Sequence, residues 1–475
     1  MRARSVDIGL EPPPEPAGRW SRSLWLDGLA QDVTPRPPLV GRQECDIAII
    51  GAGFGGLWTA YYLKNADPSL RVVVLEAEVA GFGAAGRNGG WVSAGIAGSR
   101  AGYARSRGRD VVLRAERETQ TSVDEIGRVI AAERIDCGFV KAGALTLATS
   151  RPQAERMRSQ LAASREFGVS EADRRLLSAE ECRAHLPGAA RVVSGTFTPH
   201  CARVDPARLA RGLADACERL GVRLYEQSRV QSYDDGEVRC PHATLRAELV
   251  IHATEAYRVE ERHHRRDFLP IFSMMIATEP LPEPVWRELG WVDGLTVVDK
   301  HHLYYYAQRT PDGRIALGGR GAHHRLRQPL APENERDRQV FRSLVHTLHD
   351  SFPATRGARL THHWGGAIAV PRDWCMRVSL ERAHKTGFVG GFGGHGVVAA
   401  NIAGRTMRDL ILRSDTELVT FPWVNHRGRA WEPEPLPLIA SRLIVKTLES
   451  ADAHEDGHQR AARRVKLVAP FLPPY

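Results

Sequence analysis

The stretch DIAIIGAGFGGLWTAYYL, residues 46–63, decides the fold, because it passes from a strand pattern to a helix pattern through one glycine-rich turn. The branched residues of CDIAII predict a buried strand. A helix is expected from about Gly55 and should end before Pro68, since the residue preceding a proline disfavours helical backbone. The segment RVVVLEAE, residues 71–78, supplies a second strand. Together these elements predict a βαβ unit of about 30 residues.

The turn carries the spacing Gly-x-Gly-x-x-Gly, filled by Gly51, Gly53 and Gly56. The first glycine permits a tight turn, the second lets a pyrophosphate approach the backbone, and the third lets helix and strand pack closely. The phosphates would lie on the N–H groups and positive end of the helix. Glu76, at the end of the second strand, can accept hydrogen bonds from an adenosine ribose. The pattern predicts a dinucleotide site; its alternative is a glycine-rich turn in an unrelated α/β protein.

Two further glycine-rich segments favour FAD over NAD. Residues 76–95, EAEVAGFGAAGRNGGWVSAG, contain little that would form a regular element, as expected where chain runs beside a long, flat cofactor. Residues 385–412, KTGFVGGFGGHGVVAANIAGRTMRDLIL, predict a strand, a turn and a helix that starts near His395. A second helix N-terminus can stabilise negative charge on a reduced flavin, which NAD would not need.

Composition excludes several classes of protein. The chain has 475 residues, of which 43% are hydrophobic and 25% charged, which suits a globular protein of two or three domains. No apolar run approaches the about 18 residues that span a bilayer, and the N-terminus has no secretory pattern, so we expect a cytoplasmic location without a transmembrane segment. The seven scattered cysteines indicate reduced, buried thiols. The net charge of +9 is dispersed, so no nucleic-acid partner is expected, and no feature indicates an oligomeric state.

The motifs resemble those of FAD-dependent oxidoreductases of the D-amino-acid oxidase type, and most of all the branch of glycine/sarcosine oxidases and γ-glutamylputrescine oxidase. The resemblance covers about residues 20–435. Besides the three segments already quoted, it rests on SLWLD (23–27), VDPARLARGLADACERLGV (204–222), LVIHATEAY (249–257) and RIALGGRG (314–321). In the second of these, Asp205 and Pro206 predict the N-cap and first position of a helix.

The resemblance implies an α/β fold, with a Rossmann-like FAD-binding domain of the glutathione-reductase type and an antiparallel-sheet substrate domain of α+β character. Both would be discontinuous in sequence. The FAD-binding domain would comprise residues 41–100, 200–255 and 355–430, and the substrate domain residues 101–199 and 256–354. An N-terminal arm (1–40) and a C-terminal extension (431–475), with a helix near 438–452, would lie outside them. The apolar face of that helix should dock on its own chain, with a twin subunit or a membrane as alternatives.

The motifs and the resemblance together give a set of cofactor contacts. They are Gly51, Gly53, Phe54, Gly55, Gly56, Glu76, Ala77, Gly83, Arg87, Asn88, Gly89, Gly90, Trp91, Val230, Ala253, Thr254, Gly365, Gly391, Gly393, Gly394, His395, Gly396 and Val397. Gly365 stands where sarcosine oxidases carry the cysteine that bonds the flavin, so FAD should be held non-covalently. No metal site is expected, because adjacent histidines on a strand point to opposite faces.

The resemblance implies oxidation of the C–N bond of a primary or secondary amine or amino acid. A hydride would pass to flavin N5, the imine would hydrolyse in water, and O2 would reoxidise the flavin to give H2O2. The protein would mainly orient the substrate and exclude water. The candidate catalytic residues are His395, Tyr304, Tyr306, Trp91 and Lys300.

Departures from the family pattern leave the substrate and the electron acceptor open. Ala316 replaces a lysine implicated in oxygen reactivity, so an amine dehydrogenase that passes electrons to a quinone or carrier protein is an alternative. Val398 replaces a lysine that grips the substrate carboxylate. Cationic candidates elsewhere suggest a pocket for an anionic amine, such as an aminophosphonate, although solvated turn residues are the simpler interpretation. They are Lys300, His301, His302, Arg320, His323, His324, His362 and His363. A non-catalytic flavin-binding subunit is the alternative from another class.

Overall fold

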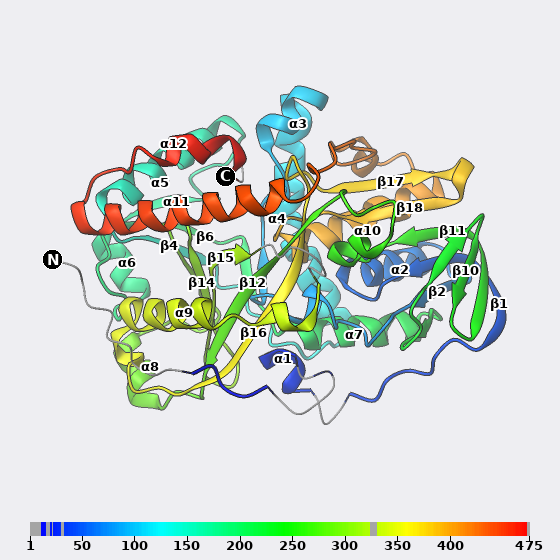
Figure 1. Cartoon of the computed structure of the whole chain (residues 1–475), viewed down its shortest axis with the longest axis horizontal. Helices are drawn as coiled ribbons and strands as arrows, with labels where there is room; N and C mark the ends of the chain where they lie inside the picture. Colours follow the sequence, from blue (N-terminus) through cyan, green and yellow to red (C-terminus); the bar gives the residue numbers. More distant parts are fainter. Residues whose placement is uncertain (1–10, 16–19, 21, 30–32, 324–329, 473–475) are drawn as a thin grey trace.

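The structure of the chain is a computed structural model in which residues 11–15, 20, 22–29, 33–323 and 330–472 are described. Two eight-stranded sheets dominate it, one at the right of Figure 1 and the other at its centre and left. A separate two-stranded sheet joins β3 (Trp91–Ser93) to β7 (Cys201–Arg203). None of the described helices is both long and apolar enough to cross a membrane.

The first sheet is built around the strand that opens the sequence motif. Its order is β17-β18-β11-β1-β2-β8, and the hairpin β9-β10 pairs with β11. The strands are β1 (Gly41–Ile50), β2 (Val72–Leu75), β8 (Arg223–Tyr225), β9 (Ser232–Asp234), β10 (Glu237–Cys240), β11 (Ala243–His252), β17 (Arg377–Glu381) and β18 (Thr386–Gly390). Strands β18, β11, β1, β2 and β8 run parallel, as a Rossmann-like fold requires.

Three of the expected helices cover this sheet. They are α2 (Phe54–Ala66), α7 (Pro206–Arg219) and α10 (Gly396–Leu412). Helix α2 completes the predicted βαβ unit, and Asp205 caps α7 by accepting hydrogen bonds from the N–H groups of Ala207 and Arg208, both at 3.0 Å. Helices α2 and α10 cross so closely that a Cβ at Gly404 would lie 2.7 Å from the Cβ of Trp58. This contact holds the middle of α10 against the first half of α2.

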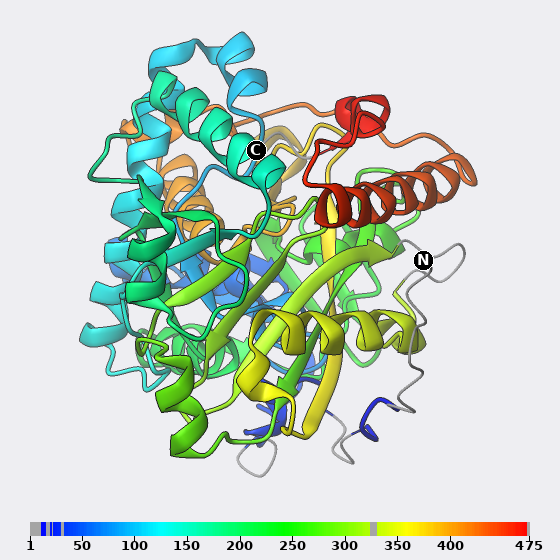
Figure 2. The ribbon, with the colours of Figure 1, turned by 90° about the vertical axis from the view of Figure 1, so that its left-hand side faces the viewer.

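The second sheet has the order β16-β12-β15-β14-β13-β4-β6-β5. Its strands are β4 (Ala144–Ala148), β5 (Arg175–Ser178), β6 (Ser194–Thr198), β12 (Leu269–Thr278), β13 (Thr296–Asp299), β14 (Tyr305–Arg309), β15 (Ile315–His323) and β16 (Leu360–Val370). It is antiparallel as expected except between β13 and β4, which run parallel. Helix α9 (Arg338–Ser351) packs on β12 and β15 and lies in front of the sheet in Figure 2.

The segment 355–430 divides between the two sheets. Its first strand, β16, pairs with β12 in the second sheet, whereas β17, β18 and α10 belong with the first. The assignment of the whole segment to the FAD-binding side therefore needs correction at its start, because β16 shares its ladder with β12. The remaining domain limits stay a prediction.

The described part of the N-terminal arm holds the glycine-rich loop. Helix α1 (Leu24–Asp27) buries Trp25, which is 3% exposed. The hydroxyl of Ser23 donates to the carbonyl of Gly86 at 2.8 Å, and the Trp25 indole donates to the carbonyl of Asn88 at 2.9 Å. These bonds satisfy backbone groups of a loop that has little secondary structure of its own.

The remaining helices flank the sheets. They are α3 (Arg100–Arg107), α4 (Arg109–Ala132), α5 (Arg151–Glu166), α6 (Ala179–His185), α8 (Glu283–Leu289), α11 (Leu436–His458) and α12 (Val465–Val468). Helix α4 packs on α10, and α11, longer than expected, runs across the upper part of the second sheet in Figure 1. The short 3-10 turns are η1 (Ala84–Gly86), η2 (Glu255–Glu260), η3 (Pro332–Glu335), η4 (Pro353–Thr355), η5 (Arg382–His384), η6 (Glu417–Thr420) and η7 (Ala469–Phe471). All seven cysteines are buried and free, as predicted.

The turn after β16 is fixed by an ion pair that should make stability depend on pH. The Asp373 carboxylate contacts Nε2 of His426 at 2.7 Å and accepts a hydrogen bond from the Cys375 N–H at 3.2 Å. The bond to Asp373 is the main reason that the pKa of His426 is raised from 6.5 to about 9. The stabilisation is therefore complete below pH 6.5 and is lost as the pH rises through about 9.

We expect the urea midpoint of the wild type to fall between these two pH values. The variant His426→Gln should lack this part of the fall, which is on the order of 2 kcal/mol. The measurement is urea unfolding at a series of pH values, with Asp373→Asn as a second variant that removes the partner. Equal pH slopes in the wild type and both variants would contradict the assignment.

Candidate active site

A cavity of about 1750 Å³ lies between the two sheets and receives side chains from both. Gly51 and Val230 line it from segments that follow β1 and β8 of the first sheet, and Ser273, Tyr306 and Gly366 line it from strands of the second. Ligand pockets usually measure about 300–1,000 Å³. The cavity therefore has room for a large cofactor together with a substrate.

The three motif glycines have two different roles, one in packing of the chain and one at the cavity. Gly51 has φ +104°, and a Cβ there would lie 2.8 Å from the carbonyl oxygen of Ala253. A Cβ on Gly56 would collide with the carbonyl oxygen of Gly51. At Gly53, by contrast, the nearest atom to an added Cβ would be the Cβ of Ala85, at 3.8 Å. The first and third glycines thus serve chain packing, while the second leaves space into which a pyrophosphate fits.

Glu76 is held at the cavity wall by backbone donors. Its carboxylate accepts hydrogen bonds from the N–H groups of Ala52 at 2.8 Å and Glu78 at 3.0 Å. Burial raises its pKa despite these bonds. The side chain is therefore positioned at the end of β2, where the adenosine ribose of a dinucleotide would lie.

Several buried donors at the cavity have no hydrogen-bond partner among the described residues. They are the indole N–H of Trp91, the hydroxyl of Thr254 and one terminal nitrogen of Arg87. A buried donor without an acceptor costs free energy, so these groups fit a ligand that supplies oxygen or ring-nitrogen acceptors. FAD, with its phosphates and flavin edge, meets this requirement, and the glycine loop, Glu76 and these donors are the residues that would hold it.

The second glycine-rich turn presents the start of α10 to the same cavity. Gly393 and Gly394 have φ values of +57° and +100°, and His395 forms the N-cap. Burial and then the positive charge of Arg100 lower the pKa of His395 to about 4. The imidazole is therefore neutral at pH 7, and the helix N-terminus supplies the positive potential at this place.

Glu255, which sequence reasoning missed, supports this turn. Its carboxylate accepts hydrogen bonds from the N–H groups of Gly391 at 2.7 Å and Phe392 at 3.1 Å. Burial raises its pKa to about 7. The residue itself has φ +50°, an uncommon value for a side-chain-bearing residue. Nothing in the local sequence ATEAY distinguishes it, because its partners lie more than a hundred positions away.

The candidate catalytic residues all line the cavity: His395, Tyr304, Tyr306, Trp91 and Lys300. The Tyr306 hydroxyl lies 2.9 Å from the hydroxyl of Ser273, and its ring meets Trp91 edge-on with centroids 6.2 Å apart. Burial raises the pKa of Tyr306 to about 12, which keeps the phenol neutral. Tyr304 is 41% exposed, and Tyr305, which points to the other face, is 2% exposed and belongs to the core.

Of the expected cofactor contacts, all but Gly56, Gly90, Gly365 and Gly391 line the cavity. These four pack against protein instead, and Cβ atoms at Gly365 and Gly391 would lie 2.7 Å from the Glu335 carbonyl and 2.9 Å from the Phe268 ring. The parity of β16 thus turns Gly366, not Gly365, toward the cavity. Val398 lines the cavity, whereas Ala316 is fully buried in a separate core cluster. No cysteine occurs among the described lining residues, which fits FAD without a thioether link.

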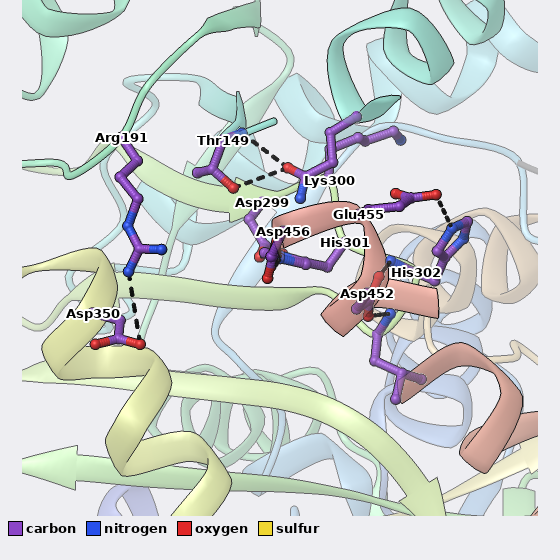
Figure 3. Close-up of polar contacts among 12 residues, drawn as sticks. Thr149, Arg191, Asp299, Lys300, His301, His302, Asp350, Asp452, Glu455 and Asp456 are labelled. Atoms are coloured by element: carbon purple, nitrogen blue, oxygen red, sulfur yellow. Dashed lines mark hydrogen bonds and ion pairs between the residues drawn. The ribbon is translucent and has the colours of Figure 1, made fainter. Parts of the chain in front are cut away.

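The described histidine pairs have structural partners. His301 contacts Asp299 and lies 3.0 Å from Asp456, and His302 lies 3.2 Å from Glu455 on α11 (Figure 3). His362 contacts Asp27 at 3.1 Å and His363 contacts the Met275 carbonyl at 3.0 Å. The side chains of Arg320 and His323, and all of His324, lie outside the described residues. The side chains of His302, Asp452 and Glu455 form a cluster with the spacing of a cation site. The Arg156 guanidinium, 3.2 Å from Glu455, supplies the positive charge there.

Helix α11 contacts the cavity through the apolar side chains of its first half. Leu436, Ile439 and Leu443 line the cavity and are 56%, 58% and 62% exposed. The apolar face expected to dock consists of Leu438, Ile439, Leu443, Ile444 and Leu448; of these Leu448 is buried and Leu438 and Ile444 are half-buried. Asp452 and Glu455, further along the helix, make the polar contacts shown in Figure 3. The helix therefore packs on the chain mainly through its second half, whereas the apolar side chains of its first half face the cavity.

Comparisons with known proteins agree with this geometry. Residues 46–410 match the family described as FAD dependent oxidoreductase (DAO). The γ-glutamylputrescine oxidoreductase of Escherichia coli is 30% identical over 409 residues, which cover 83% of this chain and 90% of that protein. The probable oxidoreductase OrdL of Haemophilus influenzae is 28% identical over 409 residues, covering 84% and 90%. The crystal structure of glycine oxidase from Geobacillus kaustophilus aligns with a TM-score of 0.66 at 20% identity, covering 81% of this chain and 100% of that one.

Enzymes of this family are FAD-dependent oxidoreductases, and the Escherichia coli relative is named as one that acts on γ-glutamylputrescine. The match spans the glycine motif, most of both sheets and the start of α10, and so includes the cavity wall apart from the part that α11 and the residues around it supply. The chain therefore belongs to the DAO family of FAD-dependent oxidoreductases and is an oxidoreductase that uses FAD.

Proposed function

We propose that the protein oxidises the C–N bond of a primary or secondary amine or amino acid. The observation that carries this proposal is the continuity of one cavity, which leads from the dinucleotide loop past the N-terminus of α10 to a wall of Tyr304, Tyr306 and Trp91. FAD, when bound, accepts the hydride equivalent from the carbon that bears the nitrogen. The name of the Escherichia coli relative, a γ-glutamylputrescine oxidoreductase, supports an amine substrate.

The residues of the chain then have three tasks. Tyr306 and Trp91 close the cavity with aromatic surface and exclude water beside the reacting carbon. His395 is neutral at pH 7 because its pKa is about 4, so it does not repel a protonated amine at this wall. The start of α10 offers backbone N–H groups and a positive dipole where negative charge develops during the reaction.

The decisive test is reduction of the bound flavin without oxygen. We expect the flavin absorbance band at about 450 nm to disappear when the correct amine is mixed anaerobically with purified protein. Product analysis should then give the aldehyde or keto acid that follows imine hydrolysis. A broad panel of amines and amino acids, none of which bleaches the flavin, would favour a flavin-binding subunit without turnover.

A second candidate concerns the electron acceptor. Ala316 lies in the core in place of the family lysine, and exposed apolar side chains of α11 line the cavity, so a quinone is a candidate acceptor. If so, reduced protein should be reoxidised much faster by a soluble ubiquinone analogue than by air-saturated buffer in stopped-flow measurements. Rapid reoxidation by O2 with stoichiometric H2O2 would instead support an oxidase.

A further inference from the structure

Lys300 and Arg174 come from distant parts of the chain but line the same cavity. Lys300 follows β13, and Arg174 precedes β5. Both side chains are half-buried. Burial, followed by the positive charges of Arg174 and Arg156, lowers the pKa of Lys300 to about 8, and burial followed by Arg100 lowers that of Arg174. The two cations are thus removed from bulk water and close enough to repel each other.

Neither cation has an acidic partner at ion-pair distance within the described part of the chain. The acids nearest to them are engaged elsewhere: Asp299 contacts His301 and accepts the Tyr305 N–H at 2.9 Å, and Glu116 pairs with Arg100 at 2.7 Å. By contrast, two other guanidinium groups at the cavity are paired: Arg87 lies 2.7 Å from Glu335 and Arg372 lies 3.1 Å from Glu432. Two enclosed positive charges without a counter-charge cost free energy unless a ligand supplies one.

The segment that carries Lys300 is held in place. Its backbone carbonyl accepts a hydrogen bond from Arg156 at 2.7 Å, and the N–H groups of His302 and Leu303 donate to Asp452 at 2.8 and 3.0 Å. Figure 3 shows this segment against the acidic face of α11. The backbone from which the Lys300 side chain extends is therefore fixed before any ligand binds, which lowers the entropy cost of binding.

We infer that Lys300 and Arg174 form an anion subsite that binds a second, acidic group of the amine substrate. The inference rests on the proposed function, since it assumes that an amine occupies the same cavity. A carboxylate and a phosphonate share the chemistry that a lysine and an arginine recognise, namely a compact oxyanion with several acceptor oxygens. Thr146 and Gln160 line the same cavity and add polar groups to its wall. The substrate class is thus an amine that also carries an oxyanion.

Binding of inert anions tests the subsite independently of turnover. Propionate, methylphosphonate and the neutral control propionamide are titrated into the FAD-loaded protein, and changes in the flavin spectrum give dissociation constants. Lys300→Met and Arg174→Met should each weaken the preferred anion about tenfold or more and leave propionamide unchanged. The anion that binds more tightly, the carboxylate or the phosphonate, identifies the acidic group of the substrate. Lys385→Met, whose ammonium pairs with Asp235 at 2.7 Å outside the cavity, is the matched control.

Steady-state kinetics provide a second test of the subsite. For the wild type, kcat/KM should favour an amine with an acidic group over its neutral counterpart, and both variants should lower this preference about tenfold through KM. Unchanged anion binding and unchanged preference in both variants, with the wild type still oxidising amines, would overturn the subsite alone. Anion binding that depends on both residues, in a protein that no amine reduces, would retain the subsite and refute the proposed function.

Discussion

Gly53→Val is expected to give a folded protein that no longer retains FAD. The backbone at Gly53 has φ −81°, which valine adopts without strain, and an added Cβ would have no neighbour closer than 3.8 Å. The branched side chain would instead fill the space through which the pyrophosphate approaches the helix N-terminus. We expect the loss of FAD affinity to reach about 3 kcal/mol, or about two orders of magnitude.

The measurement compares two properties of each variant. The ratio of flavin to protein absorbance and a titration of apo-protein with FAD report cofactor binding, while circular dichroism and thermal unfolding of the apo-protein report the fold. Gly56→Ala is the matched control, since its Cβ would collide with the Gly51 carbonyl and should disrupt the fold itself. A Gly53→Val protein that purifies with a full complement of FAD would refute the position assigned to the pyrophosphate.

Local patterns predicted the elements whose signals are contained in a few neighbouring residues. The βαβ unit follows from branched strands and a glycine turn, and Asp205 with Pro206 marks the start of α7. The start of α10 at Gly396 follows from the glycine run before it. Each of these signals is short-range, so the local sequence predicts the element without knowledge of the tertiary fold.

Long-range pairing could not be read in the same way. The parallel contact of β13 with β4 joins strands about 150 positions apart, and nothing local specifies its direction. A strand alternates its faces, so an error of one position in alignment exchanged Gly365 for Gly366 at the cavity. Arg174 was overlooked because a single arginine before a short strand looks like any exposed residue until the fold encloses it.

The contacts of the N-terminal arm also depend on long-range pairing that the sequence does not show. The sequence places this arm outside both domains, yet Ser23 and Trp25 bond to carbonyls of the loop that would contact FAD. The sequence motif SLWLD marks the arm as part of the family but does not say what it holds. The role of such a segment depends on acceptors 63 positions away, which only the folded chain brings near.

Arg87 illustrates how a residue chosen as a cofactor contact also holds the fold together. Its side chain is 1% exposed, pairs with Glu335 at 2.7 Å, and donates from Nε to the Phe82 carbonyl at 2.8 Å. The guanidinium also lies 4.5 Å above the Phe82 ring. Only one terminal nitrogen lacks a partner among the described residues and remains available for FAD. Arg87 therefore joins the glycine-rich loop to η3 through its ion pair and braces the loop itself through the Phe82 carbonyl.

Arg87→Ala is accordingly expected to destabilise the apo-protein by about 3 kcal/mol, because it leaves the buried Glu335 carboxylate without its main partner. The cost should lie near the lower end of the range for broken buried pairs, since Arg22 approaches Glu335 at 3.9 Å and compensates in part. Urea unfolding of the apo-protein measures the effect. The double variant Arg87→Ala/Glu335→Gln should be less destabilised than the sum of the two single variants, because the unpaired charge is gone. If Arg87 served only the cofactor, Arg87→Ala would weaken FAD binding and leave the unfolding of the apo-protein unchanged. An ion pair that joins the loop to η3 requires instead that FAD affinity and the stability of the apo-protein fall together.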